Sequence, residues 1–247
     1  MRMSLVWLTL PFVLFGCLSD KRMGRAQAEV DLGVAYYKEG DTEAAIAQLR
    51  EATHTDPRNW RAFNTLAITY AAKGQPELAG AAFERALKIN PGEGEILVNY
   101  GSWQIAAGQP EAAVATFETA LADLDYRNTA FVLSNLSFAL LQTGRTEDAI
   151  LRARDAVTRM PTLCQGWLHL GLAQEKAGNA DAALSAYGHL IADCPTDSVG
   201  ARLRTGCIQL HGPTPEAGID ALQAVLVDAP DTQLADEARS CLRSVGH

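Results

Sequence analysis

The chain has 247 residues, 48 % of them hydrophobic, and its 21 lysines and arginines against 29 aspartates and glutamates give a formal net charge of −8. This acidic balance argues against nucleic acid as a partner, because binding to a phosphate backbone needs cations that displace counterions. The apolar fraction excludes a disordered chain, and 41 alanines with only 7 % aromatic residues favour closely packed helices over a β-barrel.

Residues 1–16 have the pattern of a lipoprotein signal peptide. Arg2 precedes the apolar run 5–15, which Gly16 and Cys17 follow. As a helix this run extends only about 16 Å, roughly half of a hydrocarbon core, so it is too short to span a membrane. The last four residues, 14–17, resemble a bacterial lipobox, whose cysteine is acylated and becomes the N-terminus. An ordinary cleaved leader with an incidental cysteine is the alternative.

The lipobox resemblance also predicts a location. Residues 17–25 would form a short solvated tether, with a covalent lipid on Cys17. Leu18 would be the second residue of the mature chain. By the sorting rule of bacterial lipoproteins, a residue other than aspartate at this position directs the protein to the outer membrane. We therefore expect a lipid-anchored protein of the outer membrane that faces the periplasm.

Prolines mark an internal repeat after this region. Prolines 57, 91, 161, 195 and 230 are separated by 34, 70, 34 and 35 residues, which is the period of tetratricopeptide (TPR) repeats. The expected fold is all-α, a right-handed superhelical TPR solenoid of about six helix-turn-helix repeats with a C-terminal capping helix. The expected segments are 26–59, 60–93, 94–129, 130–163, 164–197 and 198–232 for the repeats, and 233–247 for the capping helix and C-terminus.

Small residues recur at fixed positions of the repeat when each of these prolines is placed at repeat position 32. Position 8 of the six repeats holds Gly33, Ala67, Gly101, Ser137, Gly171 and Gly206, which lets the first helix of each repeat approach the second closely. Further glycines are expected to end the first helix in a left-handed conformation, at positions 40, 74, 108, 144 and 178. Two departures from the frame are an insertion around 123–129, where the stacking is expected to bend, and an extra residue near Pro213, which loosens the boundaries of repeat 6.

Four cysteines remain after Cys17, an even number in a compartment that oxidises thiols. Cys164 opens the first helix of repeat 5 and Cys194 follows its second helix, so the hairpin brings these ends together. Cys207 lies about two turns into the next helix, some 12 Å from the loop of Cys194 and beyond the usual reach of roughly 7 Å between α-carbons. Cys241 follows Cys207 by 34 residues and holds the equivalent place on the next helix. We predict the disulfides Cys164–Cys194 and Cys207–Cys241.

No sequence motif indicates catalysis. The five histidines, at 54, 169, 189, 211 and 247, form no H-E-x-x-H pattern, and the sequence contains neither a G-x-S-x-G nucleophile elbow nor a P-loop. A zinc or redox site is disfavoured because there is no C-x-x-C and no histidine at ligand spacing. We expect no catalytic residue, no metal and no cofactor apart from the lipid on Cys17.

In TPR arrays, positions 2, 5, 9, 12 and 13 of the first helix usually line a concave surface. Chaperone-binding TPR domains place lysine and asparagine there to hold a terminal carboxylate, and we do not find that clamp. A mostly apolar stripe of this kind favours docking of an amphipathic helix or strand of a partner protein. The alternative is that part of it is shared helix packing or contacts the tether. The predicted groove residues are Val30, Val34, Tyr37, Asn64, Ile68, Val98, Ile105, Phe131, Phe138, Leu141, Leu168 and Leu172.

One stretch carries a more specific resemblance. Residues 163–195 read LCQGWLHLGLAQEKAGNADAALSAYGHLIADCP, including Gly188, His189 and the two flanking cysteines, and residues 202–207 read RLRTGC. With the lipobox and six repeats, the chain resembles the pilotin family of type IV pilus biogenesis and stability lipoproteins, the PilF/PilW group, and within it the Tgl type of myxobacterial social gliding motility.

The resemblance implies a non-enzymatic assembly factor. Such a lipoprotein would bind secretin subunits and promote their localisation to the outer membrane and their assembly there, for type IV pilus biogenesis and twitching or gliding motility. It implies a protein partner and no small-molecule substrate. The alternative is a periplasmic TPR adaptor lipoprotein that recruits a cell-envelope enzyme, such as a peptidoglycan hydrolase or protease.

Overall fold

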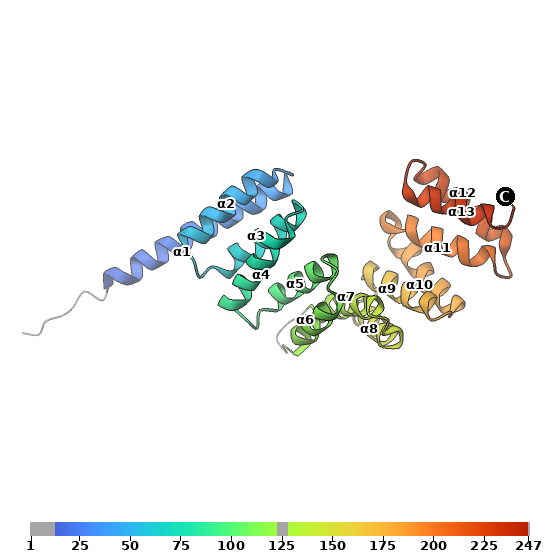
Figure 1. The fold of residues 1–247 in the computed structure, drawn as a ribbon, viewed down its shortest axis with the longest axis horizontal. Helices are drawn as coiled ribbons and strands as arrows, with labels where there is room; N and C mark the ends of the chain where they lie inside the picture. Colours follow the sequence, from blue (N-terminus) through green and yellow to red (C-terminus); the bar gives the residue numbers. More distant parts are fainter. Residues whose placement is uncertain (1–12, 123–127, 247) are drawn as a thin grey trace, which may run out of the picture. The chain divides into compact units, whose positions relative to one another are not determined.

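The computed structural model describes residues 13–122 and 128–246, which form thirteen α-helices and one short 3₁₀ helix, with no strand in these ranges. Residues 1–12 of the predicted signal peptide and residues 123–127 of the predicted insertion lie outside the described residues. Two compact units divide the chain, residues 1–103 and 104–247. Figure 1 shows antiparallel helix pairs following one another within each unit.

The first unit is built from two complete hairpins. Helices α1 and α2 form the first pair and helices α3 and α4 the second, and each pair packs closely. Helix α5 contains the boundary between the two units. The bounds are Val13–Lys38 for α1, Thr42–Thr55 for α2, Trp60–Ala72 for α3, Pro76–Ile89 for α4 and Gly94–Ala106 for α5.

The second unit continues the pattern and ends in a capping helix. Helix α7 packs on α8, α9 on α10 and α11 on α12, and the last helix, α13, packs on both α11 and α12. The fold is therefore a TPR solenoid, as the 34-residue period predicts. The bounds are Pro110–Ala122 for α6, Thr129–Gln142 for α7, Thr146–Arg159 for α8, Cys164–Lys176 for α9, Ala180–Asp193 for α10, Pro195–Asp197 for the 3₁₀ helix, Val199–Leu210 for α11, Pro215–Asp228 for α12 and Gln233–Arg243 for α13.

Glycines in a left-handed conformation form the turns between the paired helices. The five turn glycines, at 40, 74, 108, 144 and 178, all have φ between 73° and 84°, the left-handed region that the frame predicts for them. In the first turn the side chain of Asp41 also caps α2, because its Oδ1 accepts a hydrogen bond from the Ala44 backbone N–H at 3.0 Å.

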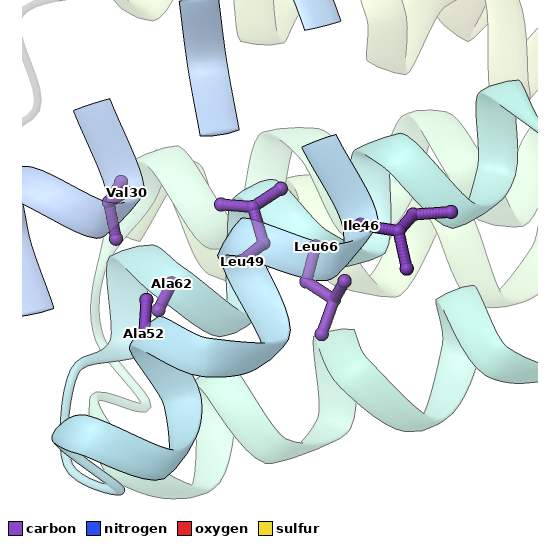
Figure 2. Packing of buried hydrophobic residues seen from close by; sticks show 6 residues of the cluster. All are labelled: Val30, Ile46, Leu49, Ala52, Ala62 and Leu66. Carbon is purple, nitrogen blue, oxygen red and sulfur yellow. The ribbon is translucent and has the colours of Figure 1, made fainter. Parts of the chain in front are cut away.

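One core cluster of the first unit lies between its first three helices. Figure 2 shows six of its residues, with Leu49 fully buried and Val30 and Leu66 only 4 % and 5 % exposed. Two of the other three positions are alanines, so the helices approach closely there. The cluster comprises Val30, Ile46, Leu49, Ala52, Ala62 and Leu66.

Gly171 gives a direct test of the close packing at position 8. A Cβ on Gly171 would lie 2.3 Å from Cε1 of Tyr187, which is fully buried and whose hydroxyl donates to Glu175 Oε2 at 2.7 Å. Gly171→Ala is therefore expected to lower the free energy of unfolding by about 1–3 kcal/mol through overpacking, although alanine by itself favours a helix. Gly188→Ala, on α10 where a Cβ meets nothing within 4 Å, should instead raise it by about 0.5–1 kcal/mol. Urea denaturation of both variants measures the difference, and equal stabilities would contradict the packing argument.

Helix α1 is longer than the first helix of repeat 1 was expected to be. It begins at Val13, so residues 17–25, predicted as a tether, are helical. Their side chains from Asp20 to Arg25 are exposed, as a solvated segment requires. An ion pair holds α1 to α2, since Arg25 Nη2 lies 3.4 Å from Glu51 Oε1. The next residue of α1, Ala26, is buried.

Candidate protein-binding surface

In the first unit, the predicted groove residues of α1 differ in exposure. Tyr37 is 38 % exposed and Val34 is half-buried against the core, but Val30 is only 4 % exposed. Val30 belongs to the core and offers no accessible surface, because it packs in one cluster with residues of α2 and α3.

Asn64 on α3 is likewise buried, with 1 % exposure. Its Nδ2 donates to Glu95 Oε1 at 3.2 Å, and its Oδ1 accepts from Asn99 Nδ2 at 3.4 Å. Asn64 is therefore a polar link from α3 to α5, since a buried amide needs hydrogen-bond partners. The neighbouring candidates Ile68 and Val98 are half-buried.

The second unit exposes more of the predicted stripe. Phe131, near the start of α7, is 39 % exposed. Phe138 is half-buried, and its ring stacks on that of His169 with centroids 4.9 Å apart. The remaining candidates are all half-buried, namely Ile105, Leu141, Leu168 and Leu172.

Two hollows adjoin this stripe. Leu141 and Leu172 line the first, of about 380 Å³, together with Glu175, Lys176 and Arg204. The second, of about 340 Å³, shares two of these residues, and its lining is Glu175, Leu203, Arg204, Cys207, Glu237, Ser240 and Cys241. The surface thus combines aliphatic walls with charges of both signs, rather than the largely apolar stripe that the groove positions predict.

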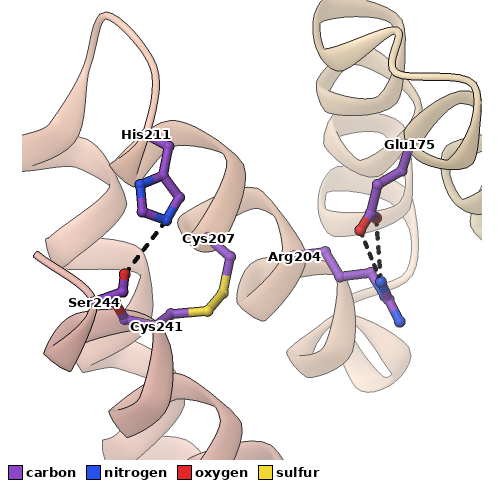
Figure 3. The surroundings of a disulfide bond; sticks show 6 residues. All are labelled: Glu175, Arg204, Cys207, His211, Cys241 and Ser244. Carbon is purple, nitrogen blue, oxygen red and sulfur yellow. Dashed lines mark hydrogen bonds and ion pairs between the residues drawn. A yellow bond between two sulfur atoms is a disulfide. The ribbon is translucent and has the colours of Figure 1, made fainter.

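An ion pair lies where the two hollows meet. Arg204 Nη1 donates to Glu175 Oε1 and Oε2 at 3.0 and 3.2 Å, and Tyr187 also donates to Glu175. Figure 3 shows this pair beside the disulfide of Cys207. Glu175 was absent from the predicted groove, although it holds position 12 of repeat 5, one of the positions expected to face a ligand.

The cysteines pair as the repeat spacing predicts. Cys164 is joined to Cys194 with 6.0 Å between α-carbons, and Cys207 to Cys241 with 5.7 Å. The first disulfide closes the hairpin of α9 and α10, and the second links α11 to the capping helix α13 (Figure 3). Cys17 lies in α1, and its side chain is outside the described residues.

His169 is buried, and its ring stacks on that of Phe138. Its Nδ1 is 2.8 Å from the Ser134 carbonyl oxygen, which can only accept, so Nδ1 carries the hydrogen. Burial lowers the pKa of His169 to about 4, and the hydrogen bond to Ser134 opposes this shift only in part. Burial, together with the hydrogen bond to Glu175, also raises the pKa of Tyr187. Both rings are therefore neutral at pH 7 and act in packing and hydrogen bonding.

Residues 13–122 and 128–246 contain no cluster of three or more histidine, cysteine, aspartate or glutamate side chains arranged to hold a metal ion. None of the helices in these ranges combines the length and the apolar character that crossing a membrane requires.

Comparison with known families agrees with the repeat. Three tetratricopeptide-repeat family profiles match residues 30–94, 70–126 and 165–197. The chain therefore belongs to the tetratricopeptide-repeat proteins, a class whose repeats mediate contacts between proteins. No curated protein sequence matches the chain.

Solved structures share the fold over most of their length. The crystal structure of PilW, a type IV pilus biogenesis factor, has a TM-score of 0.81 and 21 % identity, over 88 % of this chain and 98 % of that one. The Pseudomonas aeruginosa pilF structure has a TM-score of 0.78 and 20 % identity, over 89 % and 99 %. YrrB, a TPR protein with an unusual peptide-binding site, has a TM-score of 0.57 and 18 % identity, over 78 % and 97 %. At these identities the likeness establishes a common fold.

Proposed function

We propose that this chain is a pilotin, a non-enzymatic lipoprotein of the outer membrane that faces the periplasm and assists secretin assembly in type IV pilus biogenesis. The observation that carries the proposal is the likeness in fold to PilW and pilF across nearly the whole of all three chains. Two disulfides suit the oxidising periplasm. The proposed closeness to the Tgl type rests on the sequence resemblance alone.

The exposed and half-buried side chains of the second unit support this proposal. Phe131, Leu141 and Leu172 would take the apolar side of an amphipathic secretin segment, while Lys176 and Glu175 would meet its polar side. Acyl chains on Cys17 would hold the protein at the membrane, which raises the effective concentration of this surface for secretin subunits. No covalent step is involved, because the chaperoning function needs only binding and release.

Deletion of the gene tests the proposal directly. We expect loss of heat-resistant secretin oligomers from the outer membrane and loss of twitching or gliding, both restored by the intact chain and not by Cys17→Ala. Normal oligomers with normal motility would refute the pilotin role. Normal oligomers with a cell-wall defect would instead favour the adaptor that recruits an envelope enzyme.

A pair of variants in one hairpin tests the binding surface. Phe131 on α7 and Leu151 on α8 are 39 % and 49 % exposed, but only Phe131 belongs to the predicted groove. Phe131→Glu is expected to weaken binding of purified secretin segments at least about tenfold, as loss of an aromatic contact residue does, with an unchanged melting temperature. Leu151→Glu should bind as the unaltered chain does. Equal binding by both variants would remove Phe131 from the site.

A further inference from the structure

A cationic depression lies beside the N-terminal part of α1. It has a volume of about 510 Å³, and its lining is Lys21, Arg22, Arg25, Glu51, His54 and Thr55. Three cations and one carboxylate therefore surround it, although the chain as a whole has a net charge of −8. The local charge has the sign that attracts an anion.

Two of these cations are free to meet a ligand. Arg25 is neutralised by Glu29 and Glu51, at 2.8 and 3.4 Å. Lys21 and Arg22 are exposed, and neither forms an ion pair with any carboxylate of the described residues. Asp20 is exposed next to them but does not line the depression.

The continuity of α1 fixes where these cations lie relative to Cys17. The helix runs unbroken from Val13 to Lys38, past the end of α2 (Figure 1). Cys17, Lys21 and Arg25 are spaced by four residues, so they follow one face of the helix. Along the axis Lys21 lies about 6 Å from Cys17 and Arg25 about 12 Å. An acyl chain on Cys17 would place Lys21 and Arg22 within a Debye length, about 8 Å, of the lipid surface.

We infer that this depression binds the phosphate of an anionic phospholipid headgroup, through Lys21 and Arg22. The inference rests on the lipid anchor of the proposed function. Binding there would make α1 a rigid support rather than a loose tether. The helix would be fixed to the membrane by the acyl chain on Cys17 and, one turn further along the helix, by headgroup contacts. Helices α1 and α2 would then be held in a defined orientation to the bilayer.

Lysine labelling of the mature acylated chain in vesicles tests the site. Flotation first establishes that the protein is anchored, and trace reductive methylation with peptide mass spectrometry then gives the rate at each lysine. We expect Lys21 to react about fivefold more slowly in vesicles with phosphatidylglycerol than in pure phosphatidylcholine, the factor expected for one cation near an anionic surface. Lys38, exposed at the other end of α1, is the internal reference and should react equally in both.

Charge variants separate headgroup binding from a general surface effect. Arg22→Glu should reduce the protection of Lys21 to less than about twofold, since half of the site is reversed in charge. Arg154→Glu, the same change at an exposed position of α8, should leave it unaltered.

Each remaining result overturns a defined part of the inference. Equal Lys21 rates in both kinds of vesicle, with the protein afloat, would remove the headgroup site and leave the anchor intact. Protection of Lys21 by inorganic phosphate in phosphatidylcholine vesicles, equal to that by phosphatidylglycerol, would make the ligand a free anion. A protein that does not float has no anchor, and both the anchor and the site would then be wrong.

Discussion

Replacing Cys207 and Cys241 together by alanine is expected to destabilise the attachment of the capping helix by roughly 3–4 kcal/mol. The disulfide closes a loop with a sequence separation of 34, and the loop-closure entropy of the unfolded chain gives this magnitude. Helix α13 has 11 residues and buries only a few of them, among them Ala238 and Leu242, so it has little other attachment to α11 and α12. Among the described residues, its main neighbours are α11 and α12.

Hydrogen exchange measures this loss where it occurs. Amides of α13 are expected to exchange a few hundredfold faster in the Cys207→Ala/Cys241→Ala variant, the factor that corresponds to 3–4 kcal/mol of local opening. Cys164→Ala/Cys194→Ala is the matched control, since it should act on α9 and α10 and leave α13 protected. Amides of α3, in the first unit, should not change in either variant. Unaltered exchange in α13 would mean that hydrophobic packing alone holds the helix.

The disulfide also matters for the candidate surface. Cys207 and Cys241 line the same hollow as Glu175 and Arg204, so movement of α13 would open one wall of it. If the candidate surface binds secretin as proposed, loss of the disulfide should weaken that binding as well as the attachment of α13.

The periodic features of the fold could be predicted because several positions repeat together. Helices α3, α5 and α9 begin at Trp60, Gly94 and Cys164, the first residues of the expected repeats 2, 3 and 5. The turn glycines and the pairing of the cysteines follow from the same frame. Each depends on where a residue stands in the hairpin, which a 34-residue period specifies directly.

The depth of a side chain could not be predicted in the same way. Val30 and Asn64 stand at groove positions, yet both are buried, because the neighbouring helices supply a core cluster for one and hydrogen-bond partners for the other. The Glu175–Arg204 pair joins residues 29 apart, which is not the repeat period. Such contacts depend on the individual side chains of adjacent repeats, and the repeat pattern contains no information about them.

The buried imidazole of His169 should make the protein acid-sensitive. Its pKa is about 4 in the folded chain and about 6.5 when unfolded, so the unfolded state binds more protons between these values. Stability is therefore fully present above pH 6.5 and is lost as the pH falls towards 4. Between pH 7.5 and 4.5 the loss from this group is about 2–3 kcal/mol in the free energy of unfolding.

His169→Asn isolates this contribution. Asparagine Nδ2 lies close to the place of histidine Nδ1 and can donate to the Ser134 carbonyl, but it does not titrate. Urea unfolding at pH 7.5 and 4.5 should show a loss of stability that is smaller by about 2–3 kcal/mol in the variant, while the carboxylates and the exposed histidines contribute equally to both chains. Identical losses would mean that His169 is protonated without cost in the folded protein.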